Sequence, residues 1–206
     1  MKIMPSVLRG LFKTLAWSDF AVRPEAPPKA GQVAVAARTD TTNSLVARPE
    51  QIPETKKFRL ADTVQVNVFL NASGTFQKSW IATTMSQSQR DDLLSHEQGH
   101  YDIHALLSRD FFLAVMELKS NEYDTPGGLT VDINAAQRAT TDKSSAVQAT
   151  YDTETGTGSK PTEQAKWKGM IQSAFDTAAS PPRSAANGTA IKVTLLSVLS
   201  QNGFTF

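Results

Sequence analysis

The chain has 206 residues, with 21 Lys and Arg against 20 Asp and Glu, so its formal net charge is +1. This balance gives no strong attraction to nucleic acid or to an anionic membrane, and we expect neither as a partner. Cysteine is absent, which excludes disulfides, cysteine zinc ligands and a cysteine nucleophile. The length and a hydrophobic content of 40% suit a single globular domain.

The chain divides into four parts by composition. Residues 1–30 form an N-terminal extension and a proline-containing loop, without a clear signal peptide. Residues 31–85 are β-rich, 86–180 are helical, and 181–206 form a C-terminal strand or tail. No run of residues is long and apolar enough for an integral membrane segment.

The β-rich part carries an alternating pattern of apolar and polar residues. Strands are predicted at 32–38 and 44–48. The clearest alternation covers residues 64–70, where Val and Leu take every second position. A turn at 71–74 and a second arm at 75–83 complete a predicted β-hairpin, which comes directly before the helical part.

A long helix is predicted over residues 87–120. Ser86 and Gln89 have the spacing of a capping box, which marks a helix start. Residues 121–128 contain Pro-Gly-Gly and predict the helix end. The apolar stripe of this helix has spacings of three and four residues: His96, His100, Ile103, Leu107, Phe111, Ala114 and Leu118.

Two further helices are predicted after the long one. The first covers about 130–150, and a loop follows at 151–160. The second begins at Pro161, which suits the first position of a helix. The fold class is therefore α+β. A last strand is predicted from Ile191, Val193, Leu195 and Val198.

The three histidines of the chain all lie within residues 96–104, and two of them form the pattern H-E-x-x-H. On a helix, His96 and His100 lie one turn apart on the same face. Two imidazoles at this spacing can bind one Zn²⁺, and Glu97 between them can act as general base on the metal-bound water.

The apolar stripe supports a metal site, because it places both imidazoles toward the interior. A buried imidazole needs a partner, since an unpaired buried polar group is costly. A metal ion supplies one. The alternative interpretation is that His96 and His100 are hydrogen-bonded core residues on a helix that carries the motif by chance.

Several stretches together resemble a bacterial family known as domain of unknown function 922, whose members are often described as secreted zinc-dependent proteases. The specific stretch is Leu94-Ser95-His96-Glu97-Gln98-Gly99-His100-Tyr101-Asp102-Ile103. Shorter ones, in the order of the family, are Trp17-Ser18-Asp19-Phe20, Tyr151-Asp152-Thr153-Glu154-Thr155 and Gln164-Ala165-Lys166-Trp167.

The resemblance implies a zincin-like fold: a small antiparallel sheet with a β-hairpin before the metal-binding helix. It also implies His96 and His100 as zinc ligands, Glu97 as base and a secreted or periplasmic location. This sequence departs from the family at two positions. Thr157 stands where members usually carry a His, and His104 stands where they carry a small residue.

The departure leaves three candidates for the third zinc ligand. On a straight helix, the Cα of His104 lies about 9 Å beyond an ion that His96 and His100 share, so it is the third choice. We expect a core or supporting role for His104. Glu154 is the first choice, because a carboxylate oxygen is an accepted zinc ligand, and Asp152 is the second.

The predicted function is that of a zinc-dependent metallopeptidase acting on a peptide or protein substrate, with Zn²⁺ as cofactor. Tyr151 is a candidate donor to the oxyanion, although a packing role is an equal alternative. Asp102 is a candidate to orient a ligand histidine. A non-catalytic scaffold or structural-metal module is the main alternative function, and a zinc hydrolase of a non-peptide amide is a third. The sequence leaves the oligomeric state open.

Overall fold

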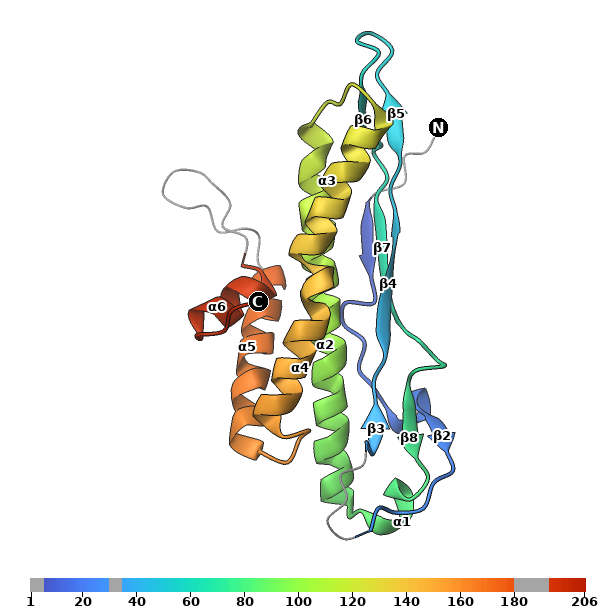
Figure 1. Ribbon diagram of the computed structural model, residues 1–206, viewed down its shortest axis with the longest axis vertical. Helices are drawn as coiled ribbons and strands as arrows, with labels where there is room; N and C mark the ends of the chain where they lie inside the picture. Colours follow the sequence, from blue (N-terminus) through green and yellow to red (C-terminus); the bar gives the residue numbers. More distant parts are fainter. Residues whose placement is uncertain (1–5, 30–34, 180–192) are drawn as a thin grey trace.

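A single long helix, α2 (Gln87–Glu117), forms the axis of the molecule, with strands on one side and the helices that follow it in the chain on the opposite side (Figure 1). The computed structural model describes residues 6–29, 35–179 and 193–206. The predicted capping box is confirmed, because Ser86 Oγ accepts from the amide of Gln89 and the Gln89 side chain accepts from the amide of Ser86. With 31 residues, α2 is about 46 Å long.

The strands form three small sheets. β7 lies between β1, which is parallel to it, and β4, which is antiparallel. β8 lies between parallel β2 and antiparallel β3, and β5 pairs with β6. The strands are β1 (Val7–Arg9), β2 (Ala21–Arg23), β3 (Ala37–Arg38), β4 (Thr41–Val46), β5 (Pro49–Gln51), β6 (Phe58–Leu60), β7 (Gln65–Leu70) and β8 (Phe76–Lys78).

The predicted β-hairpin before the long helix is wrong. A turn does lie at 71–74, but the strands on either side of it, β7 and β8, belong to different sheets. Each pairs with strands from earlier in the chain, and both sheets contain a parallel pair, so the expected antiparallel sheet is wrong too. Non-local partners therefore decide the sheets.

The helices after α2 differ from the predicted pair. The Pro-Gly-Gly at 126–128 begins a helix, because Pro126 takes its first position. The helix predicted at 130–150 is interrupted at Thr140, and its second half continues to Thr155, into the expected loop. The α-helices are α1 (Ile81–Thr84), α3 (Pro126–Ala139), α4 (Ser144–Thr155), α5 (Pro161–Ala179) and α6 (Leu195–Gln201), with 3₁₀ turns at 17–19, 118–120 and 141–143.

The prediction of a C-terminal strand is wrong, because residues 195–201 form α6. Thr194 caps this helix by accepting from the amide of Ser197. Leu195, Val198 and Leu199 then share one buried face, which has the three- and four-residue spacing of a helix. Ile191, the first residue of the predicted strand, lies outside the described residues.

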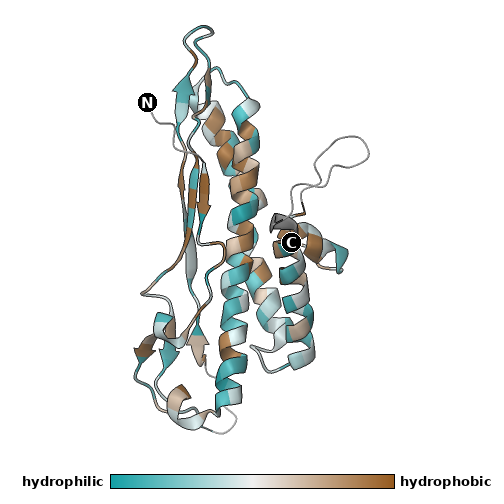
Figure 2. Ribbon diagram, turned by 180° about the vertical axis from the view of Figure 1, so that it is seen from behind, coloured by the Kyte–Doolittle hydropathy of each residue, from teal (hydrophilic) through white to brown (hydrophobic). Residues whose placement is uncertain are grey.

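The middle of α2 is buried on every side, because it lies between the sheets and the other helices. Ile103 and Leu107 pack against α4, α5 and α6, whereas Phe111 and Val115 pack against β6, β7 and α3. Hydrophobic residues follow the central strands, and the β5–β6 tip is hydrophilic (Figure 2).

A buried ion pair fixes α5 and the chain before α6 to α2. Arg109 contacts Asp110 at 2.6 Å and donates to the carbonyls of Ala174 and Val193. The other carboxylate oxygen of Asp110 accepts from the amide of Leu195.

The α+β class is confirmed by this arrangement. None of the helices in the described ranges combines the length and the apolarity that a membrane crossing requires. The finer, zincin-like description stays a prediction.

Candidate metal centre

Three side chains from two helices meet where α4 crosses the N-terminal half of α2. His96 and His100 come from α2, and Asp152 comes from α4. The Nε2 atoms of the two histidines lie 3.1 Å apart. One carboxylate oxygen of Asp152 lies 3.1 Å from Nε2 of His96 and 3.0 Å from Nε2 of His100.

The spacing of these three atoms fits a zinc ion. Zinc binds nitrogen and oxygen ligands at about 2.0–2.2 Å, which places two ligands of a tetrahedral site roughly 3.3 Å apart. The three donor atoms form a nearly equilateral triangle of slightly smaller size. One ion can therefore contact all three from one side of the triangle. The Asp152 side chain is 43% exposed, so solvent reaches the group at this residue.

Two glutamines orient the imidazole rings. Nδ1 of His100 lies 2.5 Å from Oε1 of Gln148, and Nδ1 of His96 lies 3.2 Å from Oε1 of Gln164. An amide oxygen only accepts hydrogen bonds, so each Nδ1 carries the proton and each Nε2 is left free to bind a metal. Gln148 is itself held in place, because its Nε2 donates to the carbonyl of His100.

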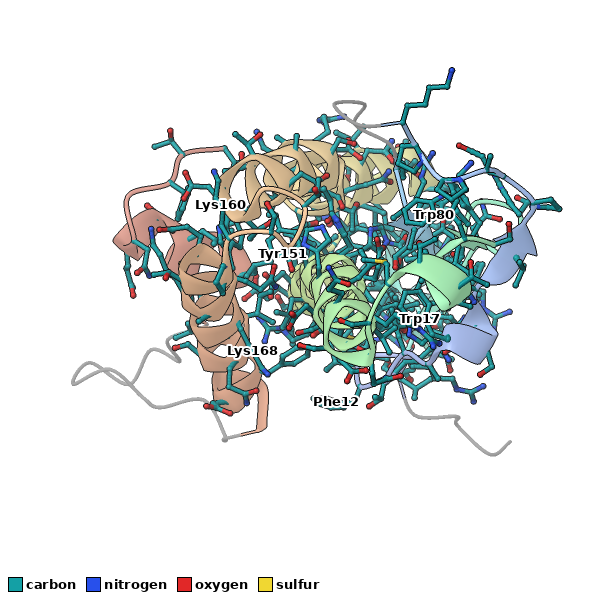
Figure 3. The ribbon with its side chains drawn as sticks, turned by 90° about the horizontal axis from the view of Figure 1, so that it is seen from below. Phe12, Trp17, Trp80, Tyr151, Lys160 and Lys168 are labelled. Carbon is teal, nitrogen blue, oxygen red and sulfur yellow. The ribbon has the colours of Figure 1, made fainter. Side chains whose placement is uncertain are left out.

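Tyr151, which lies between α4 and α2 (Figure 3), packs against both histidines. Its ring stacks on His96 at a centroid distance of 4.8 Å and meets His100 edge-on at 5.0 Å. Its hydroxyl donates to the carbonyl of His96 and accepts from Gln164 Nε2. Tyr151 is fully buried. Since its hydroxyl is committed to these contacts, the arrangement favours the packing role for Tyr151 over that of oxyanion donor.

The charges of the group favour a bound cation. Burial raises the pKa of Asp152, but the imidazoles of His100 and His96 next to its oxygen lower it more, so the carboxyl stays ionised. Burial lowers the pKa of His100, but Asp152 and then Glu97 raise it above its ordinary value. The two carboxylates thus attract positive charge to the Nε2 atoms, where a metal ion would lie.

Glu97 lies beside the histidines and is 3% exposed. Its Oε2 atom is buried and has no hydrogen-bond partner in the described part of the chain. A carboxylate oxygen without a partner is costly to bury, so it indicates a group that the side chain receives from outside the protein. Water at a metal ion is such a group.

The structure brings together five of the predicted site residues. His96, Glu97, His100 and Asp152 are neighbours, and Tyr151 packs against both histidines. Glu154, the first choice for the third ligand, is not in the group. Two residues along α4 correspond to a turn of about 200°, which carries the Glu154 side chain away from the histidines.

His104 also lies apart from the group, as predicted. Its Nδ1 contacts Ser144 Oγ at 3.2 Å, and its Nε2 is buried without a partner in the described residues. Burial lowers the pKa of His104 to about 4, although the charge of Asp40 raises it in part. His104 is therefore a neutral, partly buried histidine that supports the packing of α2.

Sequence reasoning missed the two orienting glutamines and assigned this role to Asp102. Asp102 instead accepts from Gln98 Nε2, and burial raises its pKa to about 6. Gln148 precedes Asp152 by one turn of α4. A helix has to be predicted through residue 155 before Gln148 and Asp152 can be placed on one face.

Comparison with known proteins gives no relative: neither family models, nor curated proteins, nor solved structures match the chain.

Proposed function

We propose that this protein is a zinc-dependent metallopeptidase. The observation that carries the proposal is that the donor atoms of His96, His100 and Asp152 lie as close together as ligands that share one metal ion, with Glu97 beside them. These are the residue types of a catalytic zinc site, which has three protein ligands and one open position. A structural site would instead be closed by a fourth ligand.

In this proposal, each residue of the site has one role in metal binding or in proton transfer. His96, His100 and Asp152 hold the ion, while Gln148 and Gln164 keep the imidazoles oriented. When bound, zinc polarises the scissile carbonyl and lowers the pKa of a coordinated water.

Glu97 then moves the proton. Its unpartnered Oε2 accepts the proton of the attacking water and delivers it to the nitrogen of the leaving amine. The bond from water oxygen to the carbonyl carbon forms, and the C–N bond breaks.

The test is Glu97→Gln in zinc-loaded protein. This change removes the base and leaves all three ligands, so we expect unchanged zinc content by elemental analysis and a loss of at least about 100-fold in peptide hydrolysis. Glu154→Gln, a carboxylate outside the group, is the matched control and should retain activity.

Hydrolysis that survives Glu97→Gln would overturn the assignment of the base. Tight zinc binding without hydrolysis in the unmodified protein would instead support the non-catalytic module.

A further inference from the structure

Two cavities lie against the N-terminal half of α2, next to the metal centre. The larger one, about 620 Å³, lies between α2, the loop at 156–160 and the start of α5. The smaller one, about 310 Å³, lies between α2, the chain near Leu15 and α5. Ser95, Gln164 and Lys168 line both. Each volume is in the range of known ligand sites.

The larger cavity shares two wall residues with the metal centre. Gln164 lines the cavity and holds Nδ1 of His96. Gly158 also lines it and packs so closely on His96 that an added Cβ would lie 3.1 Å from the Cβ of His96. A molecule in this cavity is thus separated from the ligand His96 by a single layer of residues.

The loop that lines the larger cavity also has a strained backbone. Thr157 lines the larger cavity with φ of +52°, in the left-handed region that a β-branched residue rarely adopts. Its neighbours Gly156 and Gly158 have φ of +58° and +87°, so three successive residues are left-handed. Such strain concentrates at functional sites, where the surrounding structure holds it.

The larger cavity has one positive and one negative residue on opposite sides. Asp92 comes from α2, and Lys168 extends from α5 into the space beside α2 (Figure 3). Neither has an ion pair or a hydrogen bond within the described ranges. The other wall residues are neutral. Some offer amide or hydroxyl groups, such as Gln89 and Ser159, and others are apolar, such as Leu93.

This mixture suits a polypeptide better than other ligand classes. A phosphate or nucleic acid site would carry an excess of positive charge, and a lipid chain would leave the two opposite charges and the amide and hydroxyl groups of this cavity without partners. A peptide offers backbone amides to the neutral polar groups and side chains of either sign to Asp92 and Lys168.

We propose that the larger cavity is a cleft for the part of the polypeptide substrate beside the scissile bond, and that Asp92 and Lys168 select side chains of this part by charge. This inference rests on the proposed peptidase function and adds to it the place and the charge preference of substrate binding.

Reciprocal charge reversals test the cleft. Lys168→Glu makes the cavity negative, and Asp92→Lys makes it positive. In zinc-loaded protein given a mixed peptide library, Lys168→Glu should reduce cleavage near acidic residues about 10-fold, and Asp92→Lys should do the same near basic residues. Mass spectrometry of the products gives both profiles.

Lys166→Glu is the matched control on the same helix. Lys166 lines neither cavity, and its ammonium group lies 3.8 Å from Glu163 and over the ring of Phe204. The cleavage profile of Lys166→Glu should equal that of the unmodified protein. If both reversal variants hydrolyse the library with the cleavage profile of the unmodified protein, the cavity is not the substrate cleft.

A binding measurement separates this inference from the function on which it rests. If the unmodified protein cleaves no peptide, the peptidase proposal fails. Fluorescence anisotropy then compares two labelled peptides that differ only in carrying Glu or Lys.

Lys168→Glu should weaken binding of the Glu peptide at least about five-fold, and Asp92→Lys should weaken binding of the Lys peptide by the same factor. If neither peptide binds, or if all variants bind both peptides equally, the proposal that this cavity is a substrate cleft is wrong.

Discussion

Asp152 supplies the carboxylate that completes the group on α2, and its removal should disable the centre. Asp152→Ala leaves two imidazoles, so we expect zinc affinity to fall by on the order of 100-fold or more. Glu154→Ala should change it less than about three-fold. Competition with a chromophoric chelator measures both. Equal losses in the two variants would mean that Asp152 is not the ligand.

The same pair of residues shows what the sequence could predict of the site. The spacing of His96 and His100 is local, so the helix alone determines that they share a face. The choice between Asp152 and Glu154 depends on whether residues 151–155 are helical and on which face packs against α2. No local pattern contains this information.

His104 should make the stability of the fold depend on pH. Its pKa of about 4 in the folded protein lies below the ordinary value of about 6.5, so between these values the unfolded chain binds a proton that the folded chain does not. The free energy of unfolding should therefore fall as pH is lowered from 6.5 to 4, by at most about 3 kcal/mol from this residue.

The comparison of unmodified protein with His104→Gln isolates that effect, because the other histidines and carboxylates cancel. In urea unfolding of metal-free protein, the stability advantage of the unmodified chain at pH 7 should shrink by up to about 3 kcal/mol at pH 4. Parallel profiles would show that His104 titrates normally.

Within α2, Gly99 lets the helix approach Tyr151. An added Cβ at this position would lie 2.2 Å from the Tyr151 hydroxyl oxygen, which donates to the carbonyl of His96. Gly99→Ala should thus destabilise the fold by about 1–3 kcal/mol, because the clash outweighs the better helix propensity of Ala. It should also weaken zinc binding, since Tyr151 stacks on His96.

Gly169 in α5 is the matched control for this change. A Cβ there meets no atom within 4 Å, so Gly169→Ala should stabilise the fold by about 0.5–1 kcal/mol through helix propensity alone. Thermal unfolding compares the two variants. A stabilising effect at Gly99 would contradict the close contact.

Elements with local signals agree with the prediction, and those with distant partners do not. The start of α2 depends on Ser86 and Gln89, three residues apart, and is correct. The strand β7 alternates as predicted, yet it pairs with β1 about 58 residues away. Alternation identifies a strand but not its partner, which explains the wrong hairpin.

α6 shows the same limit at the C-terminus. Ile191, Val193 and Leu195 alternate in the sequence, but burial against α5 selects the helical spacing of Leu195, Val198 and Leu199. For such a short segment, the tertiary contacts decide between strand and helix.

For the whole molecule, the metal centre joins parts of the chain that are far apart in sequence. His96 and Asp152 are 56 residues apart, and their helices also meet through apolar packing, the contacts of Gln148 with His100 and the hydrogen bond from Tyr151 to the carbonyl of His96. The unfolded chain cannot hold the three ligands together. Zinc therefore binds the folded state preferentially and stabilises it by mass action.

Zinc at 100 times its dissociation constant should add about 2.7 kcal/mol to the free energy of unfolding. For a domain of this size, that gain raises Tm by roughly 5–10 °C. EDTA should reverse the shift, and Asp152→Ala should lose most of it, because that variant retains only the two imidazoles. An equal rise in Tm with Asp152→Ala would place the ion outside the His96–His100–Asp152 group. Measuring both proteins across a zinc titration therefore locates the ion and tests the link between α2 and α4 together.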